Sequence, residues 1–177
     1  MKKYVICLMA MLLCMALGCN KDKDVKSASV EDASKLQTSE LKTSGLDLEK
    51  IDINNDGKVD QQVYSKDGVP KYIIRDFNFD GLTDMIEFYD DNGKHTRDEI
   101  DLDYDGNCDL IVTYENEVVK KKEFSIDFES NRHGIQMFDS KGNRTEIRRD
   151  TDHDGVIDTI EYYNAGEDEP YKVDKRK

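Results

Sequence analysis

The sequence predicts an all-β fold: an antiparallel meander of about five hairpin repeats of 24–25 residues with Asp-rich loops, which follows a disordered N-terminal tether. Three observations predict it. An Asp-rich motif of nine residues recurs at a nearly fixed interval, turn signals recur in phase with it, and the residues between them alternate between apolar and polar in the manner of strands. Because only 37% of the 177 residues are hydrophobic and another 37% are charged, a large dry core is excluded.

The Asp-rich motif has the form Asp-x-(Asp/Asn)-x-Asp-Gly-x-x-Asp. Its glycines stand at positions 57, 81, 106 and 155, so the last step leaves room for two repeats. A degenerate copy fits this gap at 125–133, where Ser125 replaces the first Asp and Ser130 replaces the Gly. The first, third, fifth and ninth positions of the four complete copies are Asp52, Asn54, Asp56 and Asp60; Asp76, Asn78, Asp80 and Asp84; Asp101, Asp103, Asp105 and Asp109; and Asp150, Asp152, Asp154 and Asp158.

Strand-like segments connect these loops to tight turns. In 84–89, Ile86 and Phe88 alternate with polar residues and share one face, as they would in a half-buried strand. More polar segments return from each turn to the next loop, so each repeat is expected to be strand, turn, strand, Asp loop. The expected turns are Asp67-Gly68, Asn92-Gly93, Asn116-Glu117, Lys141-Gly142 and Ala165-Gly166, and an aromatic residue closes the outgoing strand at Tyr64, Tyr89, Tyr114, Phe138 and Tyr163.

The side chains of the loop motif are oxygen donors at a spacing that suits a hard divalent cation. Calcium takes six to eight oxygen ligands, and the glycine permits the sharp bend that brings them together. The alternative is a set of solvated turns, since Asp, Asn and Gly are also turn formers. We favour about four calcium sites with a structural role, because fourteen acidic side chains in four short loops would repel one another without cations.

The motif DxDxDGxxD resembles the calcium loops of EF-hands, dockerins, thrombospondin type 3 repeats and the hairpin loops of FG-GAP propellers. An EF-hand needs a helix on each side of the loop. Here Gly68 and Pro70 precede the second loop and Asn92-Gly93 follows it, which leaves no room for helices. The resemblance therefore implies loops that are EF-hand-like or thrombospondin type 3-like in their ligands and lie in a β-hairpin context.

The N-terminal residues predict export and lipid anchoring. Lys2 and Lys3 precede an uncharged run over 4–17, as in a signal peptide, and Ala16-Leu17-Gly18-Cys19 resembles a bacterial lipobox, which implies that Cys19 carries palmitate and other acyl chains. An uncleaved anchor or an ordinary secretory signal is the alternative. The expected organisation is a signal peptide at 1–18, a lipidated N-terminus and disordered linker at 19–46, a calcium-binding β-repeat domain at 47–166 and a polar C-terminal tail at 167–177.

Charge and motifs limit the function. A net charge of −13 disfavours nucleic acid as a partner, and no nucleophile elbow, catalytic His or phosphate-binding Gly loop is found, so we expect no enzymatic activity. The first hypothesis is a lipid-anchored cell-envelope lipoprotein, in the outer membrane or at the cell surface, whose calcium-stabilised scaffold serves as a spacer or binding module. The alternatives are a calcium-dependent glycan- or peptidoglycan-binding protein, with Phe79 and Tyr104 as stacking residues, an envelope enzyme subunit, and an assembly subunit whose sheet edge pairs with an envelope protein.

Overall fold

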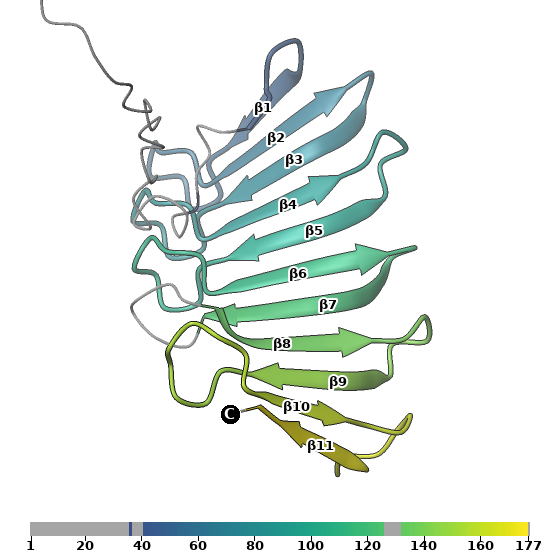
Figure 1. Ribbon diagram of the computed structural model, residues 1–177. Helices are drawn as coiled ribbons and strands as arrows, with labels where there is room; N and C mark the ends of the chain where they lie inside the picture. The colour runs from purple at the N-terminus through teal and green to yellow at the C-terminus, as the bar shows by residue number, and fades with distance from the viewer. Residues whose placement is uncertain (1–35, 37–40, 126–131, 177) are drawn as a thin grey trace, which may run out of the picture.

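One antiparallel sheet contains every strand in the described part of the chain. The computed structural model describes residues 36, 41–125 and 132–176, and in these ranges each strand pairs with its neighbours in sequence (Figure 1). The all-β meander predicted from the sequence is therefore confirmed. No helix long and apolar enough to span a membrane occurs in these ranges. The strands are β1 (Asp47–Ile51), β2 (Gln61–Lys66), β3 (Val69–Arg75), β4 (Met85–Tyr89), β5 (His95–Ile100), β6 (Leu110–Glu115), β7 (Val118–Ser125), β8 (Arg132–Phe138), β9 (Arg144–Arg149), β10 (Thr159–Tyr162) and β11 (Lys172–Lys175).

The two ends of the strands differ in their connections. Long Asp-rich connections lie along one end of the strands, which we call the loop end, and short connections lie along the other, the turn end (Figure 1). Loops 1, 2, 3 and 4 are residues 52–60, 76–84, 101–109 and 150–158. The turn end joins β2–β3, β4–β5, β6–β7, β8–β9 and β10–β11 into five hairpins, so the loops all face the same way.

The turns explain why the repeat alternates between 24 and 25 residues. Seven residues (65–71) separate the cross-strand partners Tyr64 and Tyr72, whereas eight (89–96) separate Phe88 and Arg97. The next two hairpins repeat this order, with 114–120 and then 138–145 between their equivalent pairs. The longer turns are closed by Asp90 and by its equivalent in the later hairpin, whose Oδ1 each accept two backbone N–H groups. The extra residue therefore lies in the turns, and the loops keep one length.

Alternation of side chains gives the sheet two faces, each with a thin apolar row. Ile86 is fully buried on the first face, which we call face A, and Val112 is 5% exposed on the other, face B. On face A, isoleucines alternate with charged residues that form ion pairs along their own strands, as Lys121 does with Glu123. Each buried isoleucine contributes about 1.5–3 kcal/mol. The cross-strand order on face A is Ile74, Ile86, Glu99, Ile111, Glu123, Ile135, Arg148 and Ile160.

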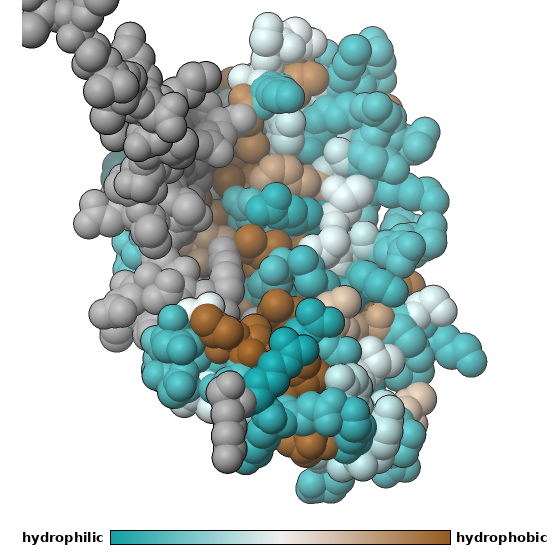
Figure 2. All heavy atoms as spheres, viewed as in Figure 1, coloured by the Kyte–Doolittle hydropathy of each residue, from teal (hydrophilic) through white to brown (hydrophobic). Residues whose placement is uncertain are grey.

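Face B carries a more continuous apolar row near the loop end. Met85 pairs with Ile100, Ile100 with Leu110, and Leu110 with Phe124. In the space-filling view, hydrophobic residues gather in a band that crosses the strands, while hydrophilic residues cover the turn end (Figure 2). The described strands thus form a single layer with modest apolar burial on both sides, so other interactions must contribute to its stability.

The first aromatic residue of the predicted series lies on the opposite face of the sheet from the second and third. Tyr64 pairs with Tyr72, which pairs with Phe88, and the rings of these neighbours meet edge to face at 6.5 and 5.7 Å on face A. Tyr89 and Tyr114 lie on face B. Tyr64 falls one residue earlier in its repeat than Tyr89 does, and a shift of one residue moves a side chain to the opposite face of a sheet.

The C-terminal boundary also differs from the expected organisation. Strand β11 lies inside 167–177, the segment expected to be a polar tail, and it pairs with β10 from Lys172 to Lys175. Its four residues alternate weakly because Val173 is the one apolar side chain among charged neighbours. The sheet therefore continues one strand beyond the predicted repeat domain.

The turn at Asn116-Glu117 offers a test of backbone strain. Both residues have positive φ, 52° and 66°, as the two-residue hairpin turn requires, and Glu tolerates this region poorly. We expect Glu117→Gly to raise the free energy of unfolding by about 0.5–1 kcal/mol, measured by urea denaturation. Glu115→Gly, within strand β6, is the matched control and should lower it. A destabilised Glu117→Gly variant would contradict the proposed strain.

Candidate metal sites

The first Asp of each loop organises the loop through backbone N–H groups. Asp101 Oδ1 accepts the N–H of Tyr104 and Oδ2 accepts that of Gly106, both at 2.7 Å. Asp76 and Asp150 make the equivalent pairs of contacts at 2.7–2.8 Å. Asp52 accepts from Gly57 at 2.8 Å and from Asp56 at 3.2 Å. Since these bonds bend the chain around one carboxylate, the loop is curved by its own sequence.

The ninth Asp closes the loop onto its beginning. Asp84 Oδ2 accepts the N–H groups of Phe77 at 2.6 Å and Asn78 at 3.2 Å. Its Oδ1 is buried and has no hydrogen-bond partner among the described residues, and the residue is 1% exposed. A buried carboxylate oxygen without a partner is costly. The ninth residues of the other loops make the same closure: Asp60 with Ile53, Asp109 with Leu102, and Asp158 with Thr151.

Three carboxylates come together in loops 3 and 4, where the third residue is Asp, and not in loops 1 and 2, where it is Asn. In loop 3 the carboxylate oxygens of Asp101, Asp103 and Asp109 lie within 4.8 Å of one another, and loop 4 has the same arrangement. In loop 2 the third residue is Asn78, whose Oδ1 accepts the N–H of Asp80 at 3.0 Å and whose Nδ2 donates to Asp80 Oδ2 at 3.0 Å. Loop 1 matches loop 2 through Asn54 and Asp56. The group in loop 4 is Asp150, Asp152 and Asp158.

The fifth-position aspartates are oriented differently from the predicted ligand set. Asp105 Oδ1 accepts the N–H of Asn107 at 2.7 Å, and Asp154 Oδ1 accepts that of Val156 at 2.8 Å. Asp56 and Asp80 make the same local turn. The fifth position therefore lies outside the three-carboxylate groups. Local hydrogen bonds of this kind are the contacts that the solvated-turn alternative predicts.

Neighbouring loops place their aspartates next to one another. The N–H of Asp76 donates to the carbonyl of Asp60, and that of Asp101 to the carbonyl of Asp84, each at 2.8 Å. All four residues are buried. Burial raises the pKa of Asp101, although the N–H groups of Gly106 and other loop residues act to lower it. Adjacent buried carboxylates of like charge oppose folding unless cations neutralise them.

This series of neighbouring aspartates is interrupted at the degenerate copy and at the C-terminal end. Ser125 donates its N–H to the carbonyl of Asp109 at 2.7 Å, in the place of a first Asp. Arg176 does the same with Asp158 at 2.7 Å. Residues 126–131 of the degenerate copy lie outside the described residues, as do Cys19, the predicted signal peptide and residues 20–35 and 37–40 of the predicted linker. The structure thus leaves those predictions as they stand.

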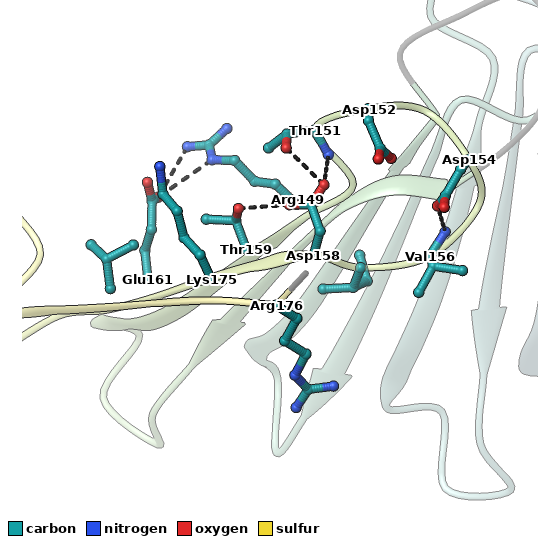
Figure 3. Close-up of a pocket in the computed structure, with 12 residues that line it drawn as sticks. Arg149, Thr151, Asp152, Asp154, Val156, Asp158, Thr159, Glu161, Lys175 and Arg176 are labelled. Atoms are coloured by element: carbon teal, nitrogen blue, oxygen red, sulfur yellow. Dashed lines mark hydrogen bonds and ion pairs between the residues drawn. The ribbon is translucent and has the colours of Figure 1, made fainter.

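An open depression of about 1010 Å³ lies beside loop 4 and is lined in part by β11 (Figure 3). Arg149 pairs with Glu161 at 3.3 Å along its wall. Asp158 accepts hydrogen bonds from the hydroxyls of Thr151 at 2.7 Å and Thr159 at 2.6 Å. The Thr159 hydroxyl, followed by that of Thr151, holds the pKa of Asp158 below its ordinary value. Loop 4 therefore keeps this carboxylate ionised at neutral pH.

Face B also carries a polar cluster around His95 that no motif in the sequence indicates. The ring of His95 stacks between Tyr89 and Tyr114, and its Nε2 lies 2.5 Å from Asp98 Oδ1. The hydroxyl of Tyr114 donates to Asp98 Oδ2 at 2.7 Å. Burial, followed by the hydrogen bond to Asp98, raises the pKa of Tyr114. The cluster spans 25 positions, from Tyr89 to Tyr114, so only the strand register could have revealed it.

Comparison with known proteins shows limited similarity. No protein-family model matches the chain, and no curated protein matches it. Among solved structures, accessory secretory protein 1, 2 and 3 of Streptococcus pneumoniae is 14% identical with a TM-score of 0.44, over 70% of this chain and 24% of that one. The glycosylation-associated protein (Gap123) complex of Streptococcus agalactiae gives 15% and 0.38, over 80% and 21%. The chain spans about a quarter or less of their length, and similarity this weak supports no conclusion about activity.

The hydroxyl of Thr159 provides a test of the electrostatics of loop 4. In Thr159→Val the carboxylate of Asp158 loses its strongest donor, so the pKa of Asp158 should rise towards its ordinary value in metal-free protein. A carboxyl whose folded pKa is depressed stabilises the fold above its unfolded pKa, and this contribution disappears as the pH falls through the folded pKa. The variant should therefore be less stable near neutral pH and equal to the parent in strong acid.

Carboxyl carbon NMR titration of Asp158 and thermal melts at several pH values measure both effects. Thr145→Val is the matched control, because its hydroxyl donates to the carbonyl of Met137. An unchanged pKa of Asp158 in Thr159→Val would contradict the assignment.

Proposed function

We propose that the chain is a calcium-binding, lipid-anchored protein of the bacterial cell envelope, in which calcium stabilises a β-repeat scaffold without enzymatic activity. The scaffold serves as a spacer or a binding module. About four calcium ions bind, one in each complete loop, through the side chains at the first, third and ninth positions. The fifth-position carboxylate adds a further calcium ligand when it rotates away from the N–H group that donates to it.

The unpartnered oxygen of Asp84 carries this proposal. A hydrogen-bonded turn would satisfy or expose each carboxylate oxygen, whereas Asp84 Oδ1 is buried with no donor among the described residues. A cation supplies the missing partner and neutralises Asp84 beside Asp101. Since Asp76, Asn78 and Asp84 offer only hard oxygen donors, they fit calcium rather than zinc or copper. The carboxylate groups of loops 3 and 4 support the same interpretation.

Charge and burial favour a structural role for the ions. The apolar rows are thin, and buried aspartates of adjacent loops lie side by side. A site filled at tenfold its dissociation constant adds about 1.4 kcal/mol to the free energy of unfolding. Four independent sites would add about 6 kcal/mol, which is comparable to the stability of a small domain.

The substitution Asp84→Asn tests whether Asp84 is a calcium ligand or only a residue that shapes the turn. The amide oxygen can still accept the N–H of Phe77, and the amide nitrogen replaces the unpartnered oxygen. Without calcium the variant should therefore be at least as stable as the parent, because an unpaired amide is cheaper to bury than an unpaired charge. With calcium at tenfold the dissociation constant, its stabilisation should be about 1.4 kcal/mol smaller.

Thermal melts in EDTA and in calcium, together with calorimetric stoichiometry, measure this difference. Asp91→Asn is the matched control, since Asp91 is an exposed turn residue paired with Lys71 at 3.0 Å, and it should keep the full calcium response. If the parent protein melts at one temperature in EDTA and in calcium, the proposed function is wrong.

Lipid anchoring depends on Cys19 and has an independent test. Expressed in a bacterial host fed labelled palmitate, the full chain should carry label and sediment with membranes, because several acyl chains hold a protein firmly. Cys19→Ser should lose both properties. Cys108→Ala, which changes a buried residue of loop 3, should keep both. Label retained in Cys19→Ser would exclude this anchor.

A further inference from the structure

The loops expose apolar side chains between their aspartates. Eleven large hydrophobic residues are exposed in the described part of the chain, and eight of them lie in the four loops. Two rings are at the fourth position of adjacent loops: Phe79 is 39% exposed and Tyr104 is 46% exposed. The other six are Ile53, Val59, Phe77, Leu82, Leu102 and Val156. This concentration marks the loop end as a surface that contacts something other than water.

The fourth position is an unfavourable place for an aromatic residue. Phe79 and Tyr104 have φ of 64° and 66°, in the left-handed region that bulky side chains rarely adopt. Loop 1 has Asn55 there, with φ of 61°, and Asn adopts this conformation readily. The fold therefore does not need an aromatic ring at this position, and loops 2 and 3 retain one at a cost in stability. Such local strain is characteristic of functional positions.

The two rings have equivalent settings. Phe79 and Tyr104 each donate their N–H to Oδ1 of the first Asp of the loop at 2.7 Å, so the two residues occupy the same place in their loops. Loops 2 and 3 are two strands apart, which corresponds to about 10 Å. The fifth-position side chains of Asp80 and Asp105, which lie outside the proposed set of first-, third- and ninth-position ligands, are exposed in the same loops. We call these two rings and the neighbouring polar side chains of loops 2 and 3 the aromatic row, because the two loops are adjacent along the loop end.

We propose that this row, Phe79 and Tyr104 with the polar side chains of loops 2 and 3, binds a β-1,4-linked glycan chain. The carbon-bound hydrogens of a pyranose ring stack on an aromatic face, and the ring hydroxyls bond to carboxylates. Two β-1,4-linked sugar units extend by nearly the spacing of the two loops, so each aromatic ring meets an equivalent sugar. The inference rests on the proposed function only in that calcium orders the loops.

The charge of the loops favours a glycan over a membrane surface. Each exposed ring has carboxylates as close neighbours in its loop, and the loops stay negative with calcium bound, because fourteen carboxylates exceed the eight positive charges of four calcium ions. Insertion of Phe79 and Tyr104 into a bilayer would bring those carboxylates to the lipid phosphates, where they are repelled. Neutral sugar hydroxyls have no such penalty, and they can donate hydrogen bonds to carboxylates.

The test uses the double variant Phe79→Asn/Tyr104→Asn, which copies the residue of loop 1. The variant should fold, melt at the same or a higher temperature, and keep the calcium-induced shift. Calorimetry in calcium should show binding of chitohexaose or cellohexaose to the parent protein and at least tenfold weaker binding to the variant. Maltohexaose, which is α-linked, should bind neither. Tyr171→Asn, an exposed aromatic outside the row, is the matched control and should bind like the parent.

The outcomes distinguish this inference from the proposed function. If calcium shifts the melting temperature of both proteins but neither β-linked hexamer binds the parent, the glycan proposal falls and the calcium proposal stands. If calcium shifts the melting temperature of neither protein and the parent still binds glycan through the two rings, the calcium proposal falls and the glycan proposal stands. Equal glycan binding by parent and variant, or sedimentation of the parent with phosphatidylcholine vesicles that the variant loses, would overturn the assignment of the row.

Discussion

Hydrogen bonds from backbone N–H groups to aspartate carboxylates are the interaction on which the loop end depends. The carboxylate of the first Asp accepts hydrogen bonds from N–H groups at the centre of the loop, as Asp101 does in loop 3. The carboxylate of the ninth Asp accepts them from N–H groups at the start of the loop, as Asp84 does in loop 2. These bonds set the path of the chain and leave the intervening residues pointing outward. In loops 3 and 4 the same geometry brings three carboxylates within 4.8 Å of one another, so it also creates an electrostatic demand for cations.

The strands have a different requirement: they must form a stable single-layered sheet although they bury little apolar area. Face A alternates isoleucine with ion pairs, and face B adds the cluster in which Asp98 accepts from His95 and Tyr114. Because such paired polar groups contribute little net stability each, the sheet gains from any stabilisation supplied at the loop end. The proposed calcium ions would provide it where the buried charges lie.

Much of this architecture could be predicted because it is periodic. The spacing of the loop glycines and turn residues indicated the five hairpins, and the alternation around Ile86 indicated its buried face. The aromatic series did not indicate that Tyr64 lies on the opposite face from Tyr89, because a shift of one residue changes the face of a strand without breaking the series. Strand β11 was missed because its four residues have little alternation. The different roles of Asp103 and Asp105, and the unpartnered oxygen of Asp84, depend on side-chain directions that spacing alone does not specify.

Among the strands of the described ranges, each contacts only the strands that precede and follow it in sequence. The short and long turns alternate, so the smallest unit that repeats without change contains two hairpins. Duplication or deletion of such a unit within a gene would preserve every remaining strand contact and the direction of every loop. The length of the sheet can therefore change in steps of two hairpins. Related chains with sheets of different length could arise from one ancestral pair of hairpins without any change in strand packing.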